Sequence, residues 1–513
     1  MAQEKKPSSS EEPEVMEKIV SLCKRRGFVF QSSEIYGGLK SCYDYGPLGA
    51  ELKRNVKAEW WRAMVHGRED IVGIDASIIM HPKVWEASGH LAGFADPLVD
   101  CKDCKNRGRA DKWPQIPPGT PVEYKVIVDH QTGKKETRKG EVGKLGIVCP
   151  VCGSPNASDI RRFNLMFRAS LGSVDPIENI VKAIEGKGLR GDELKKAIEE
   201  AMKETAVYLR PETAQAMFVN FLNVQQAARL KPPFGIAQQG KSFRNEITVE
   251  HFTFRSCEFE QMEMEFFVPP PQYVSPGDKT DMEWFDYWCS ERLDWYVRLG
   301  IRKEKLRLRA HEPSELAHYA KACKDVEYEY PWGWGELEGI AHRTDYDLKQ
   351  HEKHSGKKLT YFDPEKKVHY HPFVIEPAAG ADRTALAFLL DAYTEEPPSE
   401  MRKEGRVLLK LHPRLAPIKV AVFPLVRKDG MPETARKVVA AFWQAGVNAF
   451  YDEKDAVGRR YARQDEAGTP YCLTVDGQTA QDETVTIRER DSMKQERIKI
   501  AEAVKVVRKR LAE

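Results

Sequence analysis

Arginine, aromatic and carboxylate side chains gather in three nearby segments in the middle of the chain. They are Phe-Arg-Asn-Glu at 243–246, Phe-Arg at 254–255 and Phe-Glu-Gln-Met-Glu at 259–263. An arginine stays charged and its planar fork binds phosphate oxygens in pairs, while an aromatic face can stack on a purine. This combination predicts a site for a nucleoside triphosphate. The alternative is a strand pair whose charged residues form surface ion pairs.

A fourth segment adds small residues and another arginine. Gly-Ala-Asp-Arg at 380–383 precedes an apolar run, so we expect it to open a helix. The amino end of a helix favours anions, small residues allow a ligand to approach closely, and Arg383 supplies a further fork for phosphate. These four residues alone are weak evidence, and the inference depends on their order after the earlier segments.

Four of the ten cysteines form two Cys-x-x-Cys pairs, Cys101 with Cys104 and Cys149 with Cys152. This spacing is typical of the knuckles of a structural zinc ribbon, and four thiolates would close the tetrahedron. The alternative is a set of reduced thiols without metal. The other six cysteines show no disulfide framework, which fits a reducing cytoplasm.

Helical and strand periodicities surround these segments. Leu48, Leu52, Val56 and Trp60 recur four apart and predict one face of an amphipathic helix. A β-branched stretch at 71–79 follows it as a predicted strand that ends near Pro82.

The segment 235–268 predicts a strand, a polar loop and a second strand. In the second strand Phe259, Gln261, Glu263 and Glu265 alternate with apolar residues, so we expect them on one side, facing a cleft. Residues 380–393 predict a helix that buries its leucines.

With 513 residues, 41% of them apolar, the chain is long enough for two or more domains. Its net charge of +2 neither indicates nor excludes nucleic acid. The polar segment 1–14 lacks the features of a signal peptide, and we expect a disordered tail. No apolar run approaches the roughly 20 residues that cross a bilayer, so no membrane role is expected.

Changes in composition predict further boundaries. A polar stretch at 101–160, with a hairpin turn at 131–133, predicts an inserted module that carries the four paired cysteines, and about 175–203 predicts an inserted amphipathic helix without chemistry. The domain that carries the predicted nucleotide site then covers 15–100 and 161–410. From 415 to 513, strands at 418–424, 449–451 and 471–475 and a helix at 432–445 indicate a small α/β domain.

The helix and strand ending near Pro82, the Phe-Arg-Asn-Glu hairpin and the Gly-Ala-Asp-Arg helix resemble motifs 1, 2 and 3 of class II aminoacyl-tRNA synthetases. Further segments resemble the dimeric glycyl-tRNA synthetase family: Phe-Asn-Leu-Met-Phe at 163–167, Leu-Arg-Pro-Glu-Thr-Ala-Gln at 209–215, Gly-Glu-Leu-Glu-Gly-Ile at 335–340 and Glu-Pro-Ala-Ala-Gly at 376–380. The resemblance implies an α+β catalytic domain with a mostly antiparallel sheet, an inserted zinc-ribbon-like module and a C-terminal α/β anticodon-binding domain.

The resemblance also implies a reaction: ATP and Mg²⁺ activate glycine to glycyl-adenylate, and glycine is then transferred to the 3′ end of tRNA(Gly). Arg244 would hold the α-phosphate, and Arg255 and Arg383 would hold the γ-phosphate. Arg244 and Arg383 are the implied catalytic residues, which need only align and stabilise charge. Phe259 would stack on adenine. The ATP-binding residues that it implies are Arg244, Asn245, Glu246, Phe254, Arg255, Phe259, Glu336, Leu337, Gly380 and Arg383.

Glycine offers an ammonium, a carboxylate and two hydrogens, so its pocket should surround the ammonium with carboxylates and exclude a methyl group. The resemblance implies Arg109, Glu212, Gln261, Glu263, Glu376 and Ala378 as its glycine-binding residues. Ala378 replaces a serine that is usual in the family, and Cys257 replaces a basic residue. Both departures bear on the details of glycine binding.

In the C-terminal domain, the stretch 457–465 carries the resemblance to an anticodon-binding domain. Its Arg459, Arg460 and Arg463 lie near a tyrosine, which suits contacts with phosphates and unpaired bases. A solvated basic face is the alternative.

Two other functions remain open at this point. Another class II synthetase, such as the prolyl or threonyl enzyme, would share the fold, although the segments 209–215 and 335–340 argue against it. A catalytically inactive, synthetase-like RNA-binding protein is also compatible with this fold, but should have lost its phosphate arginines. The resemblance further implies a homodimer.

Overall fold

The computed structural model describes residues 12–129, 134–248, 251–317, 319–398 and 404–512. The predicted turn at 131–133 and residues 1–11 of the predicted tail lie outside these ranges. Helix α1 (Glu12–Arg26) begins inside the segment predicted to be disordered, so that prediction is wrong from Glu12 onward.

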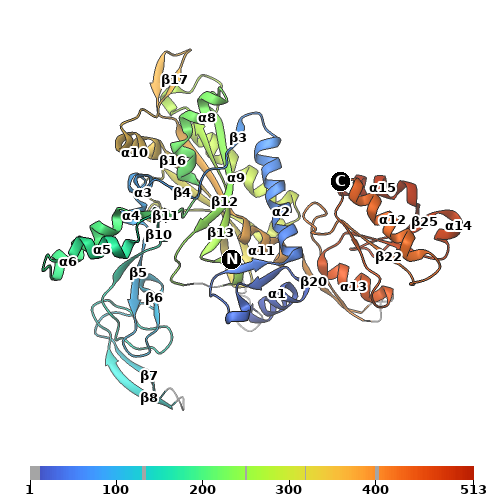
Figure 1. Ribbon diagram of the computed structural model, residues 1–513, viewed down its shortest axis with the longest axis horizontal. Coiled ribbons are helices and arrows are strands. Elements are labelled where there is room, and N and C mark those ends of the chain that lie inside the picture. The colour runs from blue at the N-terminus through green and yellow to red at the C-terminus, as the bar shows by residue number, and fades with distance from the viewer. Residues whose placement is uncertain (1–11, 130–133, 249–250, 318, 399–403, 513) are drawn as a thin grey trace, which may run out of the picture.

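A seven-stranded sheet forms the centre of the molecule (Figure 1). Its strands, in spatial order, are β14 (Leu306–Ala310), β15 (Ala322–Tyr330), β16 (Gly333–Thr344), β19 (Phe373–Gly380), β13 (Glu258–Val268), β12 (Phe234–Phe243) and β3 (Ile71–Gly73). All neighbours are antiparallel except β12 and β3. The sheet is therefore mostly antiparallel, as the sequence predicts.

The two faces of strand β13 serve different purposes. Met262, Met264 and Phe266 are fully buried in the main hydrophobic core, together with residues of α9 (Asp281–Arg298) and α11 (Ala381–Ala392). The alternate side chains of Phe259, Gln261 and Glu263 line a cavity on the opposite face. The period of two in this strand thus places the core on one side and polar chemistry on the other.

The predicted helix at 46–61 is α2 (Pro47–Trp61), and Leu52, Val56 and Trp60 are buried on its inner face. The strand predicted after it is interrupted. Only β3 and β4 (Ile79–Met80) are strands within 71–80, because the chain leaves the central sheet after Gly73 and pairs β4 with β11 (Ala206–Leu209).

The inserted four-cysteine module projects from one side of the catalytic domain (Figure 1). It contains the sheet β6-β5-β9 (β5, Ala95–Asp100; β6, Arg107–Arg109; β9, Arg161–Asn164) and the hairpin of β7 (Pro121–Asp129) and β8 (Lys134–Glu141). The second insert is two helices rather than one, α5 (Pro176–Ile184) and α6 (Gly191–Lys203). Gly186 and Gly188, both with positive φ, lie between them, and Gly191, also with positive φ, begins α6.

The C-terminal domain lies on the opposite side of the catalytic domain from this module (Figure 1). Its five-stranded sheet has the order β23 (Ala449–Tyr451), β22 (Val420–Pro424), β24 (Tyr471–Val475), β25 (Thr484–Glu489) and β26 (Gln495–Lys499). The predicted helix at 432–445 is α12 (Met431–Gln444), and α13 (Val457–Ala467) and α15 (Ile500–Ala512) complete the α/β fold. Arg25 and Arg26 of α1 form ion pairs with Glu466, which joins the two domains.

The remaining elements are short or peripheral. The helices are α3 (Pro82–Ala87), α4 (His90–Gly93), α7 (Ala214–Val219), α8 (Phe221–Ala227), α10 (Tyr346–Ser355) and α14 (Thr479–Asp482). The strands are β1 (Val29–Gln31), β2 (Tyr43–Tyr45), β10 (Arg168–Ser170), β17 (Tyr361–Asp363), β18 (Val368–Tyr370), β20 (Tyr393–Glu396) and β21 (Arg406–Leu409).

An ion pair without solvent contact fastens helix α9 to the sheet. The guanidinium Nε of Arg292 donates to Glu338 Oε1 at 2.7 Å, and the Tyr296 hydroxyl donates to Glu338 Oε2 at 2.8 Å. Both charged side chains are fully buried. A charge in such a place is tolerated only while its partner remains.

We expect Arg292→Met to lower the free energy of unfolding by about 3–5 kcal/mol, because the buried Glu338 would keep the Tyr296 hydroxyl but lose its counter-charge. Urea denaturation followed by tryptophan fluorescence measures this loss. The matched control on the same helix is Arg298→Met, whose ion pair with Glu291 is solvent-exposed and should change stability by less than about 1 kcal/mol. Equal losses in the two variants would contradict the prediction.

Candidate active site

A cavity of about 510 Å³ opens on the polar face of the central sheet. Its floor is made of small residues, Gly339, Ala341, Ala378 and Gly380, on strands β16 and β19. Charged and aromatic side chains from neighbouring strands and loops form its walls. A floor of this kind leaves room for a ligand while polar groups approach it from the sides.

Most of the residues predicted for ATP and glycine line this cavity. They are Glu212, Arg244, Glu246, Phe254, Arg255, Phe259, Gln261, Glu263, Glu336, Glu376, Ala378, Gly380 and Arg383. Segments that lie more than 100 residues apart in the sequence therefore meet in one place. The pairing of β13 with β19 brings them together, since Glu263 lies opposite Ala378 and Gln261 opposite Gly380.

Arg244 lines this cavity and lies near two aromatic rings. Its guanidinium carbon is 5.4 Å from the centre of the Phe94 ring and 5.3 Å from that of Phe259. The Nε atom donates to the Pro211 carbonyl at 3.0 Å. These contacts orient the fork, and its terminal nitrogens are the atoms suited to phosphate oxygens.

The two other predicted phosphate arginines are held by carboxylates. Arg255 forms an ion pair with Glu246 at 2.9 Å. Arg383 forms one with Glu336 at 3.2 Å and stacks on Phe254 with its guanidinium carbon 4.3 Å from the ring centre. These carboxylates compensate the charge of the forks at the edge of the cavity.

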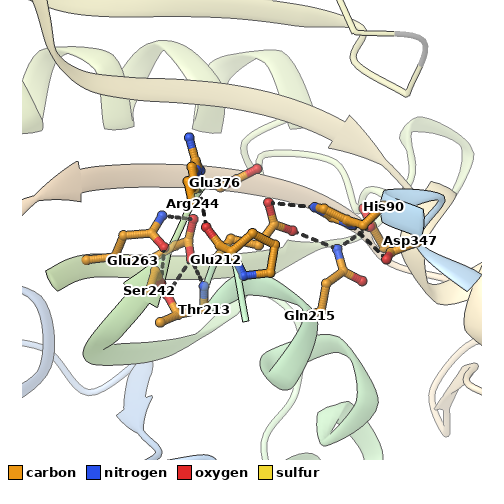
Figure 2. Close-up of polar contacts among 12 residues, drawn as sticks. His90, Glu212, Thr213, Gln215, Ser242, Arg244, Glu263, Asp347 and Glu376 are labelled. Atoms are coloured by element: carbon orange, nitrogen blue, oxygen red, sulfur yellow. Dashed lines mark hydrogen bonds and ion pairs between the residues drawn. The ribbon is translucent and has the colours of Figure 1, made fainter. Parts of the chain in front are cut away.

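Three glutamates converge on the inner end of the cavity, Glu212, Glu263 and Glu376 (Figure 2). Glu212 lies 3.3 Å from His90 Nε2 and accepts from the Gln215 amide at 3.0 Å. Glu263 accepts from the backbone N–H of Thr213 at 3.0 Å and also from the Thr213 hydroxyl.

The environments of these glutamates drive their pKa values apart. Burial favours the neutral form of Glu212, but His90, Arg343 and Gln215 outweigh it and hold its pKa well below the usual value. Burial, reinforced by Glu376 and Glu212, raises the pKa of Glu263 well above its usual range. Burial likewise raises the pKa of Glu376. Several carboxyl groups in one pocket favour a cationic ligand, which would relieve their repulsion.

Sequence reasoning missed Arg343, which organises this end of the cavity. Its side chain donates to Glu376 Oε2 at 2.7 Å and to both oxygens of Asp347 at 2.8 and 2.9 Å. His90, which contacts Glu212, was missed as well. Neither belongs to a segment with an unusual residue pattern, so the sequence alone carried no signal for them.

Glu265, two residues beyond Glu263 on β13, lies deeper than the cavity. It is fully buried, and neither carboxyl oxygen has a hydrogen-bond partner among the described residues. Burial and the nearby Glu376 raise its pKa well above the usual range, although Arg343 opposes this effect. A carboxyl group without donors in such a place is stable as the neutral acid.

Three predicted site residues do not line the cavity. Leu337 is buried in the hydrophobic core, because it alternates with Glu336 along β16 and faces the helices. Asn245 uses its backbone N–H to bind the Leu165 carbonyl. Arg109 lies on β6 of the inserted module and pairs with Asp96 at 3.0 Å and Asp111 at 2.8 Å.

The four predicted metal-binding cysteines come together in the inserted module. The Sγ atoms of Cys101 and Cys152 are 3.7 Å apart, and those of Cys104 and Cys149 are 3.5 Å apart. All four sulfur atoms lie within 4.8 Å of one another. All ten cysteines of the chain fall within the described ranges, and none of them forms a disulfide.

The three arginines predicted for the anticodon lie on α13 in different environments. Arg460 is buried and donates to the carbonyls of Pro424 and Leu425, so its fork serves the fold of the domain. Arg463 is paired with Asp452 and Asp455. Arg459 is exposed, with a contact of 4.0 Å to Asp455.

Comparison with known proteins identifies the family. Residues 419–510 match the model of the anticodon binding domain. The chain is 48% identical to the glycine–tRNA ligase of Acetivibrio thermocellus over 95% of its length and 96% of that protein. It is 49% identical to that of Clostridium acetobutylicum and 48% identical to that of Thermobifida fusca, each over 97% of this chain and 98% of the relative.

The chain belongs to the glycine–tRNA ligase family. Members of this family are aminoacyl-tRNA synthetases, so this chain is an enzyme of that class. The family excludes the prolyl and threonyl alternatives, and nothing supports an inactive RNA-binding protein.

A prolyl-tRNA synthetase of Cryptosporidium parvum has the same fold as this glycine–tRNA ligase family member. It aligns with a TM-score of 0.56 over 96% of this chain and 77% of its own, at 12% sequence identity. The class II catalytic fold and the anticodon-binding domain are thus as expected from the sequence. Among the described residues, no helix is long and apolar enough to span a membrane.

We expect Glu265→Gln to stabilise the protein increasingly as pH rises. In the unfolded chain a glutamate ionises near pH 4.3, whereas the folded protein holds Glu265 neutral to a higher pH. As pH rises above the pKa of the unfolded group, the neutral Glu265 therefore lowers the free energy of unfolding. The loss is at most about 1.4 kcal/mol per pH unit and stops when pH reaches the folded pKa. An amide does not titrate and removes this cost.

Urea denaturation at several pH values between about 5 and 9 measures the difference between variant and wild type. Glu258→Gln, at the exposed end of the same strand, is the matched control and should change stability by less than about 1 kcal/mol. A Glu265→Gln difference that stays constant with pH would show that Glu265 is not a buried neutral acid.

Proposed function

We propose that this chain uses ATP and Mg²⁺ to convert glycine to glycyl-adenylate, releases pyrophosphate, and transfers glycine to the 3′ end of tRNA(Gly). The main support is that Arg244, Arg255 and Arg383 line the same cavity as three glutamates. These are Glu212, Glu263 and Glu376. Forks for phosphates thus lie beside a pocket for a small cation. Family membership with high coverage supports this assignment.

In this proposal Arg244 holds the α-phosphate, and Arg255 and Arg383 hold the γ-phosphate. Phe259 stacks on adenine, and Glu246 and Glu336 take part in adenine binding and in placing Mg²⁺. Before ATP binds, the ion pairs of Arg255 with Glu246 and of Arg383 with Glu336 keep these two guanidinium groups ordered. The phosphates of ATP would then replace the two carboxylates as their partners. The glycine carboxylate attacks the α-phosphorus, and charge stabilisation by Arg244 is the main contribution.

The ammonium of glycine fits among Glu212, Glu263 and Glu376. Arg343 anchors Glu376 from behind, and His90 and Gln215 anchor Glu212. Gln261 is held in turn by the Ser242 hydroxyl at 2.6 Å. Carboxylates fixed in this way leave little room for a side chain on the substrate, so exclusion of larger amino acids needs no editing site.

A structural Zn²⁺ in the inserted module is part of the proposal. For Zn–S bonds of about 2.3 Å, tetrahedral geometry requires sulfur–sulfur distances of about 3.8 Å. The observed 3.7 and 3.5 Å are close to this value. Cys101, Cys104, Cys149 and Cys152 would hold the ion with no position left for substrate, and the zinc would fix the fold of the module.

We also propose contact with the tRNA anticodon through α13 and a homodimer. On α13, Arg459 has the exposed fork, while Arg460 and Arg463 support the helix from within. Support for the dimer comes from Ile35, Tyr36 and Leu39, three large apolar side chains that are 60–87% exposed. They lie in the segment whose Glu34 pairs with Lys24 of α1. Apolar side chains gathered in this way favour burial against another surface.

The test of the proposed activity is amino-acid-dependent exchange of labelled pyrophosphate into ATP without tRNA. We expect exchange with glycine and none above background with alanine, serine, proline or threonine. Arg244→Gln should reduce the exchange rate by about 10²–10³-fold, because the charge on the α-phosphate loses its main partner. Arg298→Gln, on the surface of α9, is the control and should exchange normally. Exchange with another amino acid would mean that the pocket has been misassigned.

Substitution of the cysteines tests the zinc. We expect Cys104→Ser and Cys152→Ser to lose tightly bound zinc, measured by elemental mass spectrometry, and to expose the module at 101–160 to proteolysis. Cys257→Ser, at a free cysteine outside the group of four, should keep its zinc. Wild-type protein that is free of zinc and still protected from protease would contradict the proposal.

A further inference from the structure

A second group of metal-binding residue types lies in the wall of the catalytic cavity. Its members are His311, Cys323 and Asp325, and one donor atom from each lies within 4.8 Å of the other two. His311 Nε2 is 2.7 Å from Asp325 Oδ2. None of these residues has a role in the proposed reaction.

The sheet places these donors side by side. Cys323 and Asp325 are two residues apart on β15 and therefore share one face of the strand. Their neighbours across β16 are Ala341 and Gly339, two residues of the cavity floor. His311 follows β14 directly, and its backbone N–H donates to the Cys323 carbonyl at 3.0 Å, which fixes the imidazole beside the thiol.

The space in front of the group is open and bordered by negative charge. A methyl group placed on Gly339 would meet Asp325 Oδ1 at 3.7 Å and Glu336 Oε1 at 4.0 Å. The carboxylates of Asp325 and Glu336 thus flank Gly339, on the side from which a ligand of the cavity would approach. A divalent cation here would compensate both of them.

The chemistry of the donors selects the cation. Mg²⁺ prefers oxygen ligands and would not recruit a thiol. Imidazole, thiolate and carboxylate together are a ligand set for Zn²⁺ and related transition ions, and three protein ligands leave one position open. Tetrahedral Zn²⁺ would separate the His311 and Asp325 donors to about 3.4 Å, a movement of less than about 1 Å from their present contact.

We propose that His311, Cys323 and Asp325 form a Zn²⁺ site, separate from the four-cysteine site, whose open coordination position faces the catalytic cavity. Binding replaces the hydrogen of the Cys323 thiol by the metal, and the released proton passes to solvent. The open position is available to an oxygen of a phosphate or carboxylate ligand in the cavity. The ordinary alternative is a His311–Asp325 ion pair with an inert thiol beside it.

Cobalt distinguishes these alternatives, because Co²⁺ takes zinc sites and a thiolate bond to it gives an intense near-ultraviolet charge-transfer band. Full-length protein with its tightly bound zinc retained is titrated with Co²⁺ at neutral pH. We expect wild-type protein to develop the band with one further equivalent of metal. His311→Gln should weaken this binding by at least about tenfold, because it removes one of three ligands.

Cys323→Ser should abolish the band, whereas Cys257→Ser should keep it. If Cys323→Ser does not fold, Cys323→Ala replaces it with the same expectation. The proposal is overturned if wild-type protein shows no band, or if the band persists unchanged without the Cys323 thiol. The pyrophosphate exchange assay is not needed for this result, so its outcome and that of the proposed activity are distinguishable.

Discussion

The carboxylate of Asp382 joins the three segments on which the site depends. It accepts from Lys53 of α2 at 2.7 Å and from the backbone N–H of Glu260 on β13 at 2.6 Å, and Lys53 also reaches the Glu260 carboxylate at 2.8 Å. Asp382 and Lys53 are buried, where an unpaired charge would be costly. The first turn of α11, and with it Arg383, is thereby held in register with the strand that carries Phe259 and Glu263.

At the inner end of the cavity, buried carboxyl groups again depend on specific partners. Four carboxyl groups gather there, those of Glu212, Glu263, Glu376 and Asp347, and the Arg343 guanidinium pairs with two of them, Glu376 and Asp347. The fold supports these carboxyl groups with backbone and side-chain donors from Thr213 and Gln215. This arrangement favours a small cation in the pocket. Without one, burial and mutual repulsion raise the pKa values of Glu263 and Glu376, so these carboxyl groups ionise less readily.

Sequence patterns predicted the parts of this architecture that have a local cause. The period of two in β13 and the four-residue repeat of α2 depend on residues close in the chain, and both are confirmed. The break between β3 and β4 is not local, because it depends on where β11 pairs. Arg343 and His90 escaped prediction for the same reason, since each acts on a glutamate distant in sequence. The burial of the Leu337 side chain follows from the alternation along β16, which the motif containing it does not show.

Strand β13 also limits how this protein can evolve. Its odd-numbered side chains from Phe259 to Glu263 reach the cavity, and its even-numbered ones from Met262 to Phe266 fill the core. An inserted or deleted residue within it would exchange the two sets, placing carboxylates among the helices and methionines in the pocket. The strand can therefore change by substitution but not in length, whereas the two inserts are free of this constraint. Differences in length among related chains should accordingly collect in these inserts.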